Sequence, residues 1–181
     1  RLPASAPGMK GILLLLCMLI IGCDRDRRHP GKKAQPTNAQ ELVQANKEAV
    51  KLEQHDIRLY AERLGLALTP TGTGVHIQMI RDKEGPTAMP DQWAKVNYRL
   101  ELLNGDTAYS TEPGRPESFM VEMDQVESGL HEAIQLLSAG DSAIIIIPSY
   151  RAHGLIGDQD RIPMRSSIVY RIGVVGISDR P

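Results

Sequence analysis

The stretch between residues 126 and 170 constrains the fold of this chain most, because three structural patterns follow one another closely in it. Apolar residues at helical spacing predict a short helix over 129–138. The β-branched run at 144–147 is continuous and stops at Pro148, which is typical of a buried strand. A long loop follows, and residues 168–175 then predict a second strand.

Turn and cap signals mark the ends of these elements and of the strands before them. Ser128 is a candidate N-cap of the short helix, and Gly140 is placed for a left-handed C-terminal cap. Upstream, residues 75–80 and 96–102 alternate between apolar and polar side chains, as half-buried strands do. Asn104-Gly105 follows the second of these strands and is a strong signal for a tight turn.

The order of these elements, with the residues at particular positions, resembles the FKBP-type peptidyl-prolyl isomerases. Ala152-His153-Gly154 stands where that family has an Ala-Tyr-Gly loop, and Ile162-Pro163 matches its Ile-Pro. The resemblance covers about residues 74–176. It implies an α+β domain over 66–181, with a curved antiparallel sheet of about five or six strands wrapped around the short helix. Further matching positions are Val96, Tyr98, Leu102, Gly105, Phe119, Val126, Gly129, Leu130 and Tyr170.

The resemblance implies rotation about X–Pro peptide bonds, a reaction whose uncatalysed barrier is ~18–20 kcal/mol. An apolar and aromatic cradle with one or two hydrogen-bond donors suffices for it, so no metal or cofactor is implied. In the family, the backbone N–H at the Glu127 position donates to a bound carbonyl and the loop tyrosine donates a second bond. His153 could replace that tyrosine through a ring N–H, which would make the donation sensitive to pH.

Each site residue is carried over from the family by its position in the matching motifs. The catalytic residues implied in this way are Tyr98, His153 and Tyr170. The implied substrate-binding residues are Tyr109, Phe119, Val126, Glu127, Leu130 and Ile162.

Three departures from the family pattern count against activity. Ala108 removes a large ring from the expected pocket wall, Tyr109 replaces a carboxylate, and Leu130 replaces a tryptophan at the floor. The alternative for the apolar positions is that they are simply core, which we expect for Ile134 and for the run at 144–147. Four residues match one motif set rather than a periodicity, and we expect these to form a site: Tyr98, His153, Ile162 and Tyr170.

An apolar run precedes the domain. Residues 12–21 are too few to span a bilayer as a mature helix and suit the core of a signal peptide. The run ends in Gly22-Cys23, which resembles a bacterial lipobox, so we predict a signal peptide over 1–22 and lipidation of Cys23. Met9 is the expected natural start, with the residues before it an over-extension. The alternative is an ordinary secretory signal with an incidental cysteine.

Residues 23–38 are polar with a weak basic bias, and we interpret them as a flexible tether or simply as a solvated linker. Asn38 can cap a following helix over 39–65 that stops at Gly65. A narrow apolar stripe on this helix could pair with a second copy in a homodimer, as in some envelope FKBP-type proteins. Alternatively, the stripe docks on its own domain, or the helix only spaces the domain from the membrane. The stripe consists of Val43, Val50, Ile57, Tyr60 and Leu64.

Composition argues against several other classes of function. The net charge of -1 argues against a nucleic-acid partner. Both cysteines, Cys17 and Cys23, lie near the N-terminus, so the domain has neither a disulfide nor a thiol nucleophile. The five histidines are scattered, and Gln135 stands where a zinc-protease motif beginning at His131 needs its second histidine. We therefore expect no metal site.

Together these patterns predict a lipid-anchored protein of the bacterial cell envelope that faces the periplasm, held by the outer rather than the inner membrane. Its expected activity is proline isomerisation in exported proteins, whose X–Pro bonds can limit folding. The branch that it resembles is that of the gliding-motility-associated FKBP-type lipoproteins. Two alternatives are a chaperone module that holds proline-containing or apolar segments without turnover, and a scaffold part of an envelope machine with a vestigial cleft.

Overall fold

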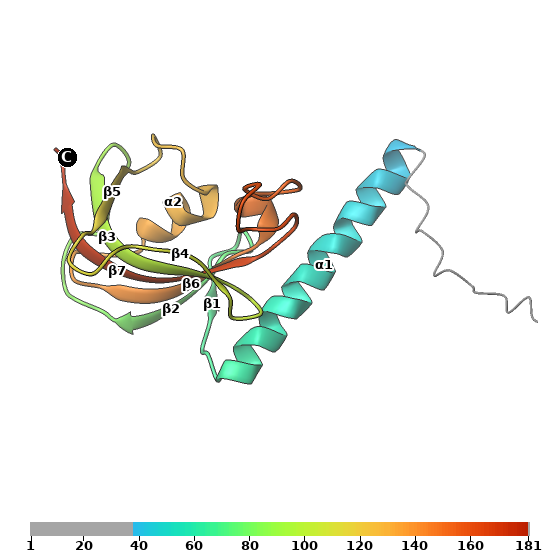
Figure 1. The fold of residues 1–181 in the computed structure, drawn as a ribbon, viewed down its shortest axis with the longest axis horizontal. Helices are drawn as coiled ribbons and strands as arrows, with labels where there is room; N and C mark the ends of the chain where they lie inside the picture. The colour runs from blue at the N-terminus through green and yellow to red at the C-terminus, as the bar shows by residue number, and fades with distance from the viewer. Residues whose placement is uncertain (1–37, 181) are drawn as a thin grey trace, which may run out of the picture. The chain divides into compact units, whose positions relative to one another are not determined.

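The computed structural model describes residues 38–180, in which a long helix, α1, precedes a β-sheet with a short helix, α2, packed on it (Figure 1). The predicted signal peptide, the predicted lipidation site Cys23 and all of the predicted tether except Asn38 lie outside the described residues. The elements are α1 (Ala39–Leu64), β1 (Thr69–Pro70), β2 (His76–Arg81), β3 (Trp93–Leu102), β4 (Thr107–Ser110), β5 (Glu117–Met120), α2 (Ser128–Ile134), β6 (Ser142–Ile147), the 3-10 helix η1 (Ser149–Arg151) and β7 (Ile168–Ser178).

The sheet has seven strands, paired antiparallel in the order β1-β2-β6-β7-β3-β4, with β5 paired to β3. It curves around α2, which confirms the predicted α+β fold (Figure 1). Our prediction of fewer strands was wrong because β1, Thr69–Pro70, is too short for any alternation to reveal it. The longest strands, β3 and β7, pair from Trp93↔Ser178 to Leu102↔Ile168 and form the frame of the sheet.

The isoleucine run of β6 is buried on both faces of the sheet. Ile145 and Ile147 belong to the main core, together with the apolar residues of α2. Ile144 and Ile146 belong to a second cluster, together with residues of α1. Because neighbouring side chains of a strand point to opposite faces, a strand covered by a helix on each side needs apolar residues at every position. This is why the run does not alternate with polar residues.

Helix α1 begins and ends where the sequence predicts. Asn38 Oδ1 accepts a hydrogen bond from the backbone N–H of Glu41 (2.8 Å), and Gly65 ends the helix in the left-handed conformation with φ of 64°. Glu41 in the first turn and Arg63 in the last turn have the charges that the helix dipole favours. Between residues 38 and 180, no helix combines the length and the apolar content that crossing a bilayer requires.

Part of the predicted apolar stripe attaches α1 to its own sheet. Ile57 and Tyr60 are 1% and 4% exposed and pack with Ile144, Ile146 and Val169. The alternative in which the helix docks on its own domain is therefore correct for this part of α1. The stripe residues nearer the N-terminus remain at the surface, with Val43 52% and Val50 37% exposed.

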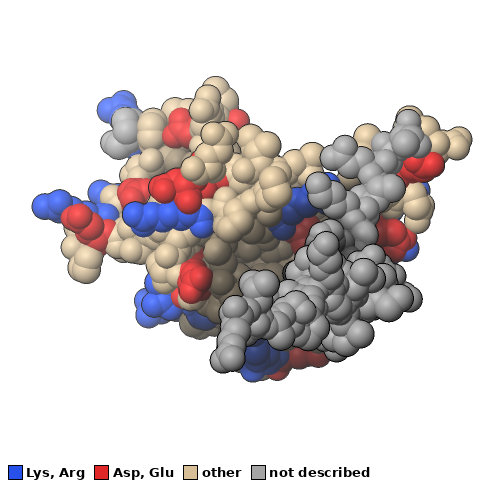
Figure 2. Space-filling view, turned by 45° about the vertical axis from the view of Figure 1, so that its right-hand side comes forward, with Lys and Arg blue, Asp and Glu red and all other residues tan. Residues whose placement is uncertain are grey.

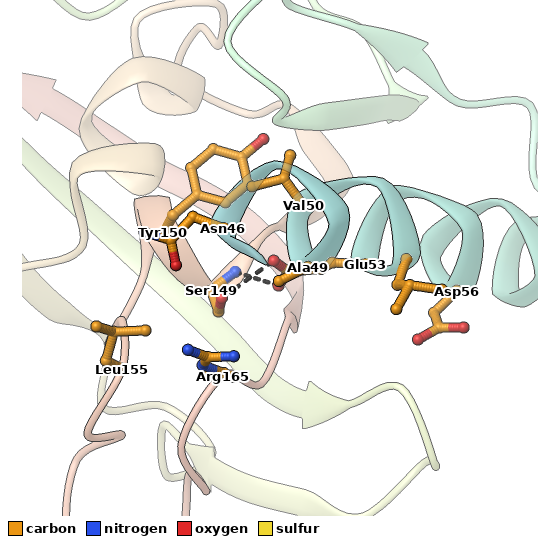
Figure 3. Close-up of a pocket in the computed structure, with 10 residues that line it drawn as sticks. Asn46, Ala49, Val50, Glu53, Asp56, Ser149, Tyr150, Leu155 and Arg165 are labelled. Carbon is orange, nitrogen blue, oxygen red and sulfur yellow. Dashed lines mark hydrogen bonds between the residues drawn. The ribbon is translucent and has the colours of Figure 1, made fainter. Parts of the chain in front are cut away.

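A carboxylate also joins α1 to the loop that follows β6. Glu53 accepts hydrogen bonds from the backbone N–H of Ser149 (2.5 Å), from the Ser149 hydroxyl (3.0 Å) and from the Ser167 hydroxyl (2.6 Å). Figure 3 shows the pair of bonds between Glu53 and Ser149. Both residues line a mostly apolar cavity of about 410 Å³ between the helix and the loop. The helix thereby holds both ends of the loop in which His153 lies.

Helix α2 is shorter than predicted. Ser128 is its first residue rather than its N-cap. The Ser128 hydroxyl donates to the carbonyl of Arg151 (3.1 Å) and accepts no hydrogen bond from a backbone N–H of the first turn. Glu127 is the N-cap and makes no side-chain capping bond. The helix ends at Ile134 instead of residue 138. Gly140 has a positive φ of 94°, but in the turn that leads into β6 rather than at a helix end.

Charged side chains of both signs are interspersed on the face drawn in Figure 2. The chain has exposed ion pairs such as Lys51–Glu48 (3.0 Å) and Arg115–Glu112 (2.9 Å). Exposed pairs of this kind contribute at most about 1 kcal/mol each. The stability of the fold therefore depends mainly on the two apolar clusters around β6.

Gly129 is required in α2 by the close approach of β6. A Cβ at this position would overlap Ile147 Cγ2 and would lie 3.1 Å from Val75 Cγ2. We predict that Gly129→Ala lowers the free energy of unfolding, measured by urea denaturation, by about 1–3 kcal/mol through overpacking. Gly176→Ala is the matched control, since a Cβ there meets nothing within 4 Å. Its effect should stay within about 0.5 kcal/mol, and equal losses in both variants would contradict this packing argument.

Candidate active site

A cleft of about 430 Å³ opens where β3, β4 and β7 meet the segment before α2 and the loop after β6. Aromatic rings and a few polar groups converge on it, which is typical of ligand-binding clefts. Six of its lining residues are among those that the sequence predicts for the site. The full lining is Tyr98, Leu100, Tyr109, Gln125, Val126, Glu127, Ala152, His153 and Tyr170.

The register of the sheet brings the aromatic residues of the cleft together. Leu100 of β3 lies opposite Tyr170 of β7 and opposite Tyr109 of β4, so the three side chains share one face of the sheet. Tyr98 is two residues from Leu100 and points to the same face. The rings of Tyr98 and Tyr170 meet edge to face, with centroids 5.5 Å apart and planes inclined by 61°.

One carboxylate lies inside the cleft, at Glu127. Its side chain is 8% exposed, and each of its oxygens has a hydrogen-bond partner. Oε2 accepts from the Tyr170 hydroxyl (3.0 Å), and Oε1 lies 2.8 Å from Nε2 of His153. Burial of an ionised carboxylate costs free energy unless donors satisfy its oxygens. Tyr170 and His153 supply one donor for each oxygen, so the group is accommodated in an otherwise aromatic cleft.

Each tyrosine hydroxyl of the cleft bonds to a carboxylate. Tyr98 donates to Glu117 Oε2 (3.1 Å), and Tyr109 donates to Asp158 Oδ2 (2.5 Å). Burial and the neighbouring Glu117 raise the pKa of Tyr98 to about 12. The hydrogen bond to Asp158 raises the pKa of Tyr109 to about 12, and burial followed by the charge of Glu127 raises the pKa of Tyr170 well above 10. All three hydroxyls therefore keep their protons and donate at physiological pH.

Asp158 organises the loop beside the cleft. Its Oδ1 accepts from the backbone N–H groups of Asp160 (3.0 Å) and Ile162 (2.7 Å), an arrangement of the Asx-turn kind. Partial burial opposes ionisation, but the Tyr109 hydroxyl and these N–H groups lower the pKa of Asp158 to about 2. Arg161 covers the Tyr109 ring, with the guanidinium carbon 5.3 Å from the ring centroid. The loop is thus tied to β4 through the ring and the hydroxyl of Tyr109.

The structure does not place all predicted site residues on the lining of the cleft. Phe119, Leu130 and Ile162 do not line it and are buried in the main core, which also includes Tyr170. The Phe119 ring contacts His131 edge to face, with centroids 5.8 Å apart. Ala108, the departure that removes a ring, is likewise buried in this core, while its neighbour Tyr109 lines the cleft.

Sequence reasoning missed six residues that line the cleft or bond to its tyrosines. Leu100 could have been found from its spacing, since it is two residues from Tyr98 on an alternating strand. Gln125 and Ala152 adjoin predicted site residues, but no chemical signal distinguishes them. Glu117 comes from an edge strand, and Asp158 and Asp160 come from a long loop. No periodicity specifies which carboxylate a tyrosine reaches there.

The cleft offers one backbone donor. None of residues 38–180 accepts a hydrogen bond from the backbone N–H of Glu127, while its carbonyl accepts from Leu130 N (2.8 Å) and His131 N (3.1 Å). An N–H without a protein partner beside an aromatic cleft can receive a carbonyl of a bound peptide. Among the described residues, no three His, Cys, Asp or Glu side chains are arranged to hold a metal ion.

Comparison with known proteins identifies the family. The sequence profile of the FKBP-type peptidyl-prolyl cis-trans isomerases matches residues 85–175. The chain is 31% identical over 85 residues to FK506-binding protein 2 of Dictyostelium discoideum, which is 46% of this chain and 64% of that protein. It is 30% identical over 108 residues to a probable FKBP-type peptidyl-prolyl cis-trans isomerase, FkpA, of Neisseria meningitidis serogroup B, which is 59% of this chain and 39% of that protein.

The chain thus spans less than two thirds of the length of these two relatives. A solved peptidyl-prolyl cis-trans isomerase of Pseudomonas syringae pv. tomato has the same fold, with a TM-score of 0.63 and 23% identity over 73% of this chain and 95% of that one. The profile match covers about half of the chain and includes most of the cleft-forming segments. The chain belongs to the FKBP-type peptidyl-prolyl cis-trans isomerase family.

Proposed function

We propose that this protein catalyses cis–trans isomerisation of X–Pro peptide bonds. The observation that carries the proposal is the cleft itself, in which Tyr98, Tyr109 and Tyr170 form an aromatic wall beside the N–H of Glu127. Each hydroxyl of that wall already bonds to a carboxylate, so the rings offer their apolar surfaces to a ligand. A proline ring is apolar and compact, which suits such a wall.

The reaction requires no covalent step. During rotation, the amide loses its resonance and the charge separation that accompanies it, so a site poor in water favours the twisted amide over the planar one. The aromatic wall would hold the proline ring, and the N–H of Glu127 would bond a substrate carbonyl while the acyl half turns. No group of the cleft needs to gain or lose a proton in this mechanism.

The second candidate function is binding without turnover, as a chaperone or scaffold module. It is favoured by the carboxylate of Glu127, which makes the cleft more polar than an apolar cradle needs to be. In that function the protein would bind proline-containing segments without accelerating their isomerisation. A turnover measurement therefore separates the two functions directly.

We predict that the full-length protein accelerates the cis-to-trans relaxation of a short X–Pro peptide, followed optically. Tyr98→Ala removes one side of the aromatic wall and should lower kcat/KM by about tenfold or more. Tyr150→Ala is the matched control, because Tyr150 lies on the other side of the loop, against α1, and does not line the cleft. It should retain near-normal turnover. Relaxation at the spontaneous rate by a folded, peptide-binding protein would support the non-catalytic module instead.

We propose further that the protein acts on exported proteins from a lipid anchor at Cys23, in the outer membrane of the cell envelope and facing the periplasm. The support is the sequence from residue 12 to Cys23, an apolar run ending in a lipobox-like Gly-Cys. A single acyl chain gives only marginal binding, so durable anchoring needs two or more. The association with gliding motility is a proposal that rests on the same lipobox and on the departures from the family pattern.

The lipid anchor predicts a specific labelling pattern. Full-length protein expressed in a bacterium with an outer membrane should incorporate an alkyne-labelled fatty acid and sediment with membranes. Cys23→Ser should abolish the label, while Cys17→Ser, the matched control inside the apolar run, should keep it. Lipidation at Cys23 would be excluded if the Cys23→Ser variant kept the label, or if the wild type carried none.

Self-association through α1 is our proposal for the exposed half of its stripe. Val43 and Val50 are seven residues apart, the spacing of apolar residues at the contact between two paired helices. Both are exposed in the single chain, so they are available for such a contact. We predict a dimer in sedimentation velocity at micromolar concentration and a monomer for the double variant Val43→Glu/Val50→Glu. Leu59→Glu is the control, because Leu59 is exposed but points away from that stripe. A monomeric wild type would exclude this dimer.

A further inference from the structure

The contact between His153 and Glu127 determines which hydrogen bonds His153 can make. Nε2 of His153 lies 2.8 Å from Oε1 of Glu127, and Oε2 of the same carboxylate accepts from Tyr170 (3.0 Å). A carboxylate accepts hydrogen bonds and cannot donate them. The proton of a neutral His153 ring therefore sits on Nε2 and is used inside the protein.

The other ring nitrogen is the only one left for a ligand. In the neutral ring with its proton on Nε2, Nδ1 carries a lone pair and is an acceptor. A substrate carbonyl is also an acceptor, so the two cannot bond. In the imidazolium both nitrogens carry protons, and Nδ1–H can then donate to a carbonyl while Nε2–H stays with Glu127. The sequence-based expectation that a neutral ring N–H would donate to the substrate does not fit this contact.

We propose that Glu127 is a positioning residue that fixes the tautomer of His153, so that the cleft gains its second substrate-directed donor only when His153 is protonated. The inference rests on the proposed function of the cleft. Its consequence is that proline peptides bind more tightly when His153 is protonated than when it is neutral. A charge-assisted bond to the substrate carbonyl replaces a contact between two acceptors.

Other charged and titratable groups surround His153 and do not supply this pH dependence by themselves. Asp158, on the same loop, interacts with the charge of His153, and its pKa of about 2 keeps it ionised throughout the range. Tyr98, Tyr109 and Tyr170 face the cleft from β3, β4 and β7 and keep their protons there. Arg161 covers the ring of Tyr109, and Glu117 and Asp160 accept from Tyr98 and Tyr109.

The tautomer can be read directly from the nitrogen shifts of ¹⁵N-histidine in the full-length protein. His131 provides an internal reference, because its Nδ1 accepts from the backbone N–H of Glu122 (2.9 Å) and its Nε2 pairs with the carbonyl of Asp124 (3.0 Å). We expect the nitrogen shifts of neutral His153 to show a proton on Nε2, as those of His131 do. The signals of His153 are assigned by their absence from the spectrum of His153→Gln. In Glu127→Gln, the amide can present either an acceptor oxygen or a donor N–H to Nε2 of His153. Neutral His153 should then be a mixture of the two tautomers.

The second measurement is the dissociation constant of the peptide Ala-Leu-Pro-Phe, titrated at pH 5 and pH 8. We expect about 10-fold tighter binding by the wild type at pH 5. Binding by His153→Gln should differ by less than about twofold between the two pH values, because the amide donates at both. His55→Gln, a change of an exposed histidine on α1, should behave as the wild type does.

The outcomes separate this inference from the proposed function. A neutral His153 with its proton on Nδ1, or pH-independent peptide binding by the wild type, would overturn the inference while leaving the binding function intact. An unchanged Nε2–H pattern in Glu127→Gln would overturn the positioning role of Glu127. Absence of peptide binding at both pH values would overturn the proposed function and with it the ligand role of His153.

Discussion

The double burial of β6 is the constraint on which the rest of the structure depends. Complete burial of an isoleucine side chain contributes about 1.5–3 kcal/mol, and β6 directs Ile145 and Ile147 to one face and Ile144 and Ile146 to the other. The first face requires α2, whose preceding residue is Glu127 in the cleft. The second face requires α1, without which an apolar strip of the sheet would meet water. Helix α1 is therefore part of the folded unit and not only a spacer.

The cleft combines an apolar wall with internal polar pairing. Three tyrosines provide the wall, and each hydroxyl is satisfied by a carboxylate, which leaves the rings free for apolar contact. The same pairing makes a nearly buried carboxylate at Glu127 tolerable, since both of its oxygens have a partner. The chemistry left for a ligand is then narrow: ring surfaces, one backbone N–H, and whatever His153 presents at a given pH.

Much of the fold could be predicted from the sequence because the spacing of apolar residues agrees with the cap and turn residues that mark the ends of the elements. The alternation of β3, the uninterrupted run of β6, the Asn38 cap and the Gly65 stop are all local signals, and each element lies where they indicate. The end of α2 and the strand β1 were missed because tertiary contacts, not local spacing, decide them. For the site, motif positions led to Tyr98, Val126, Glu127, His153 and Tyr170, but no motif specifies that Glu127 bonds both Tyr170 and His153. That pairing depends on side-chain directions across three segments of the chain.

The four consecutive isoleucines of β6 have a consequence for how its pairing is specified. A slip by one residue normally moves polar side chains into a core, and this penalty fixes the register of most strands. In β6, such a slip replaces one isoleucine by another at most positions, so the penalty is small on both faces.

The register must then be fixed at the strand ends. Asp141 accepts from the backbone N–H groups of Lys83 and Ser138 (2.6 Å each) immediately before the strand, and Pro148, which has no N–H, closes the ladder after it. In this chain, two residues outside the hydrophobic run decide which isoleucine faces which helix.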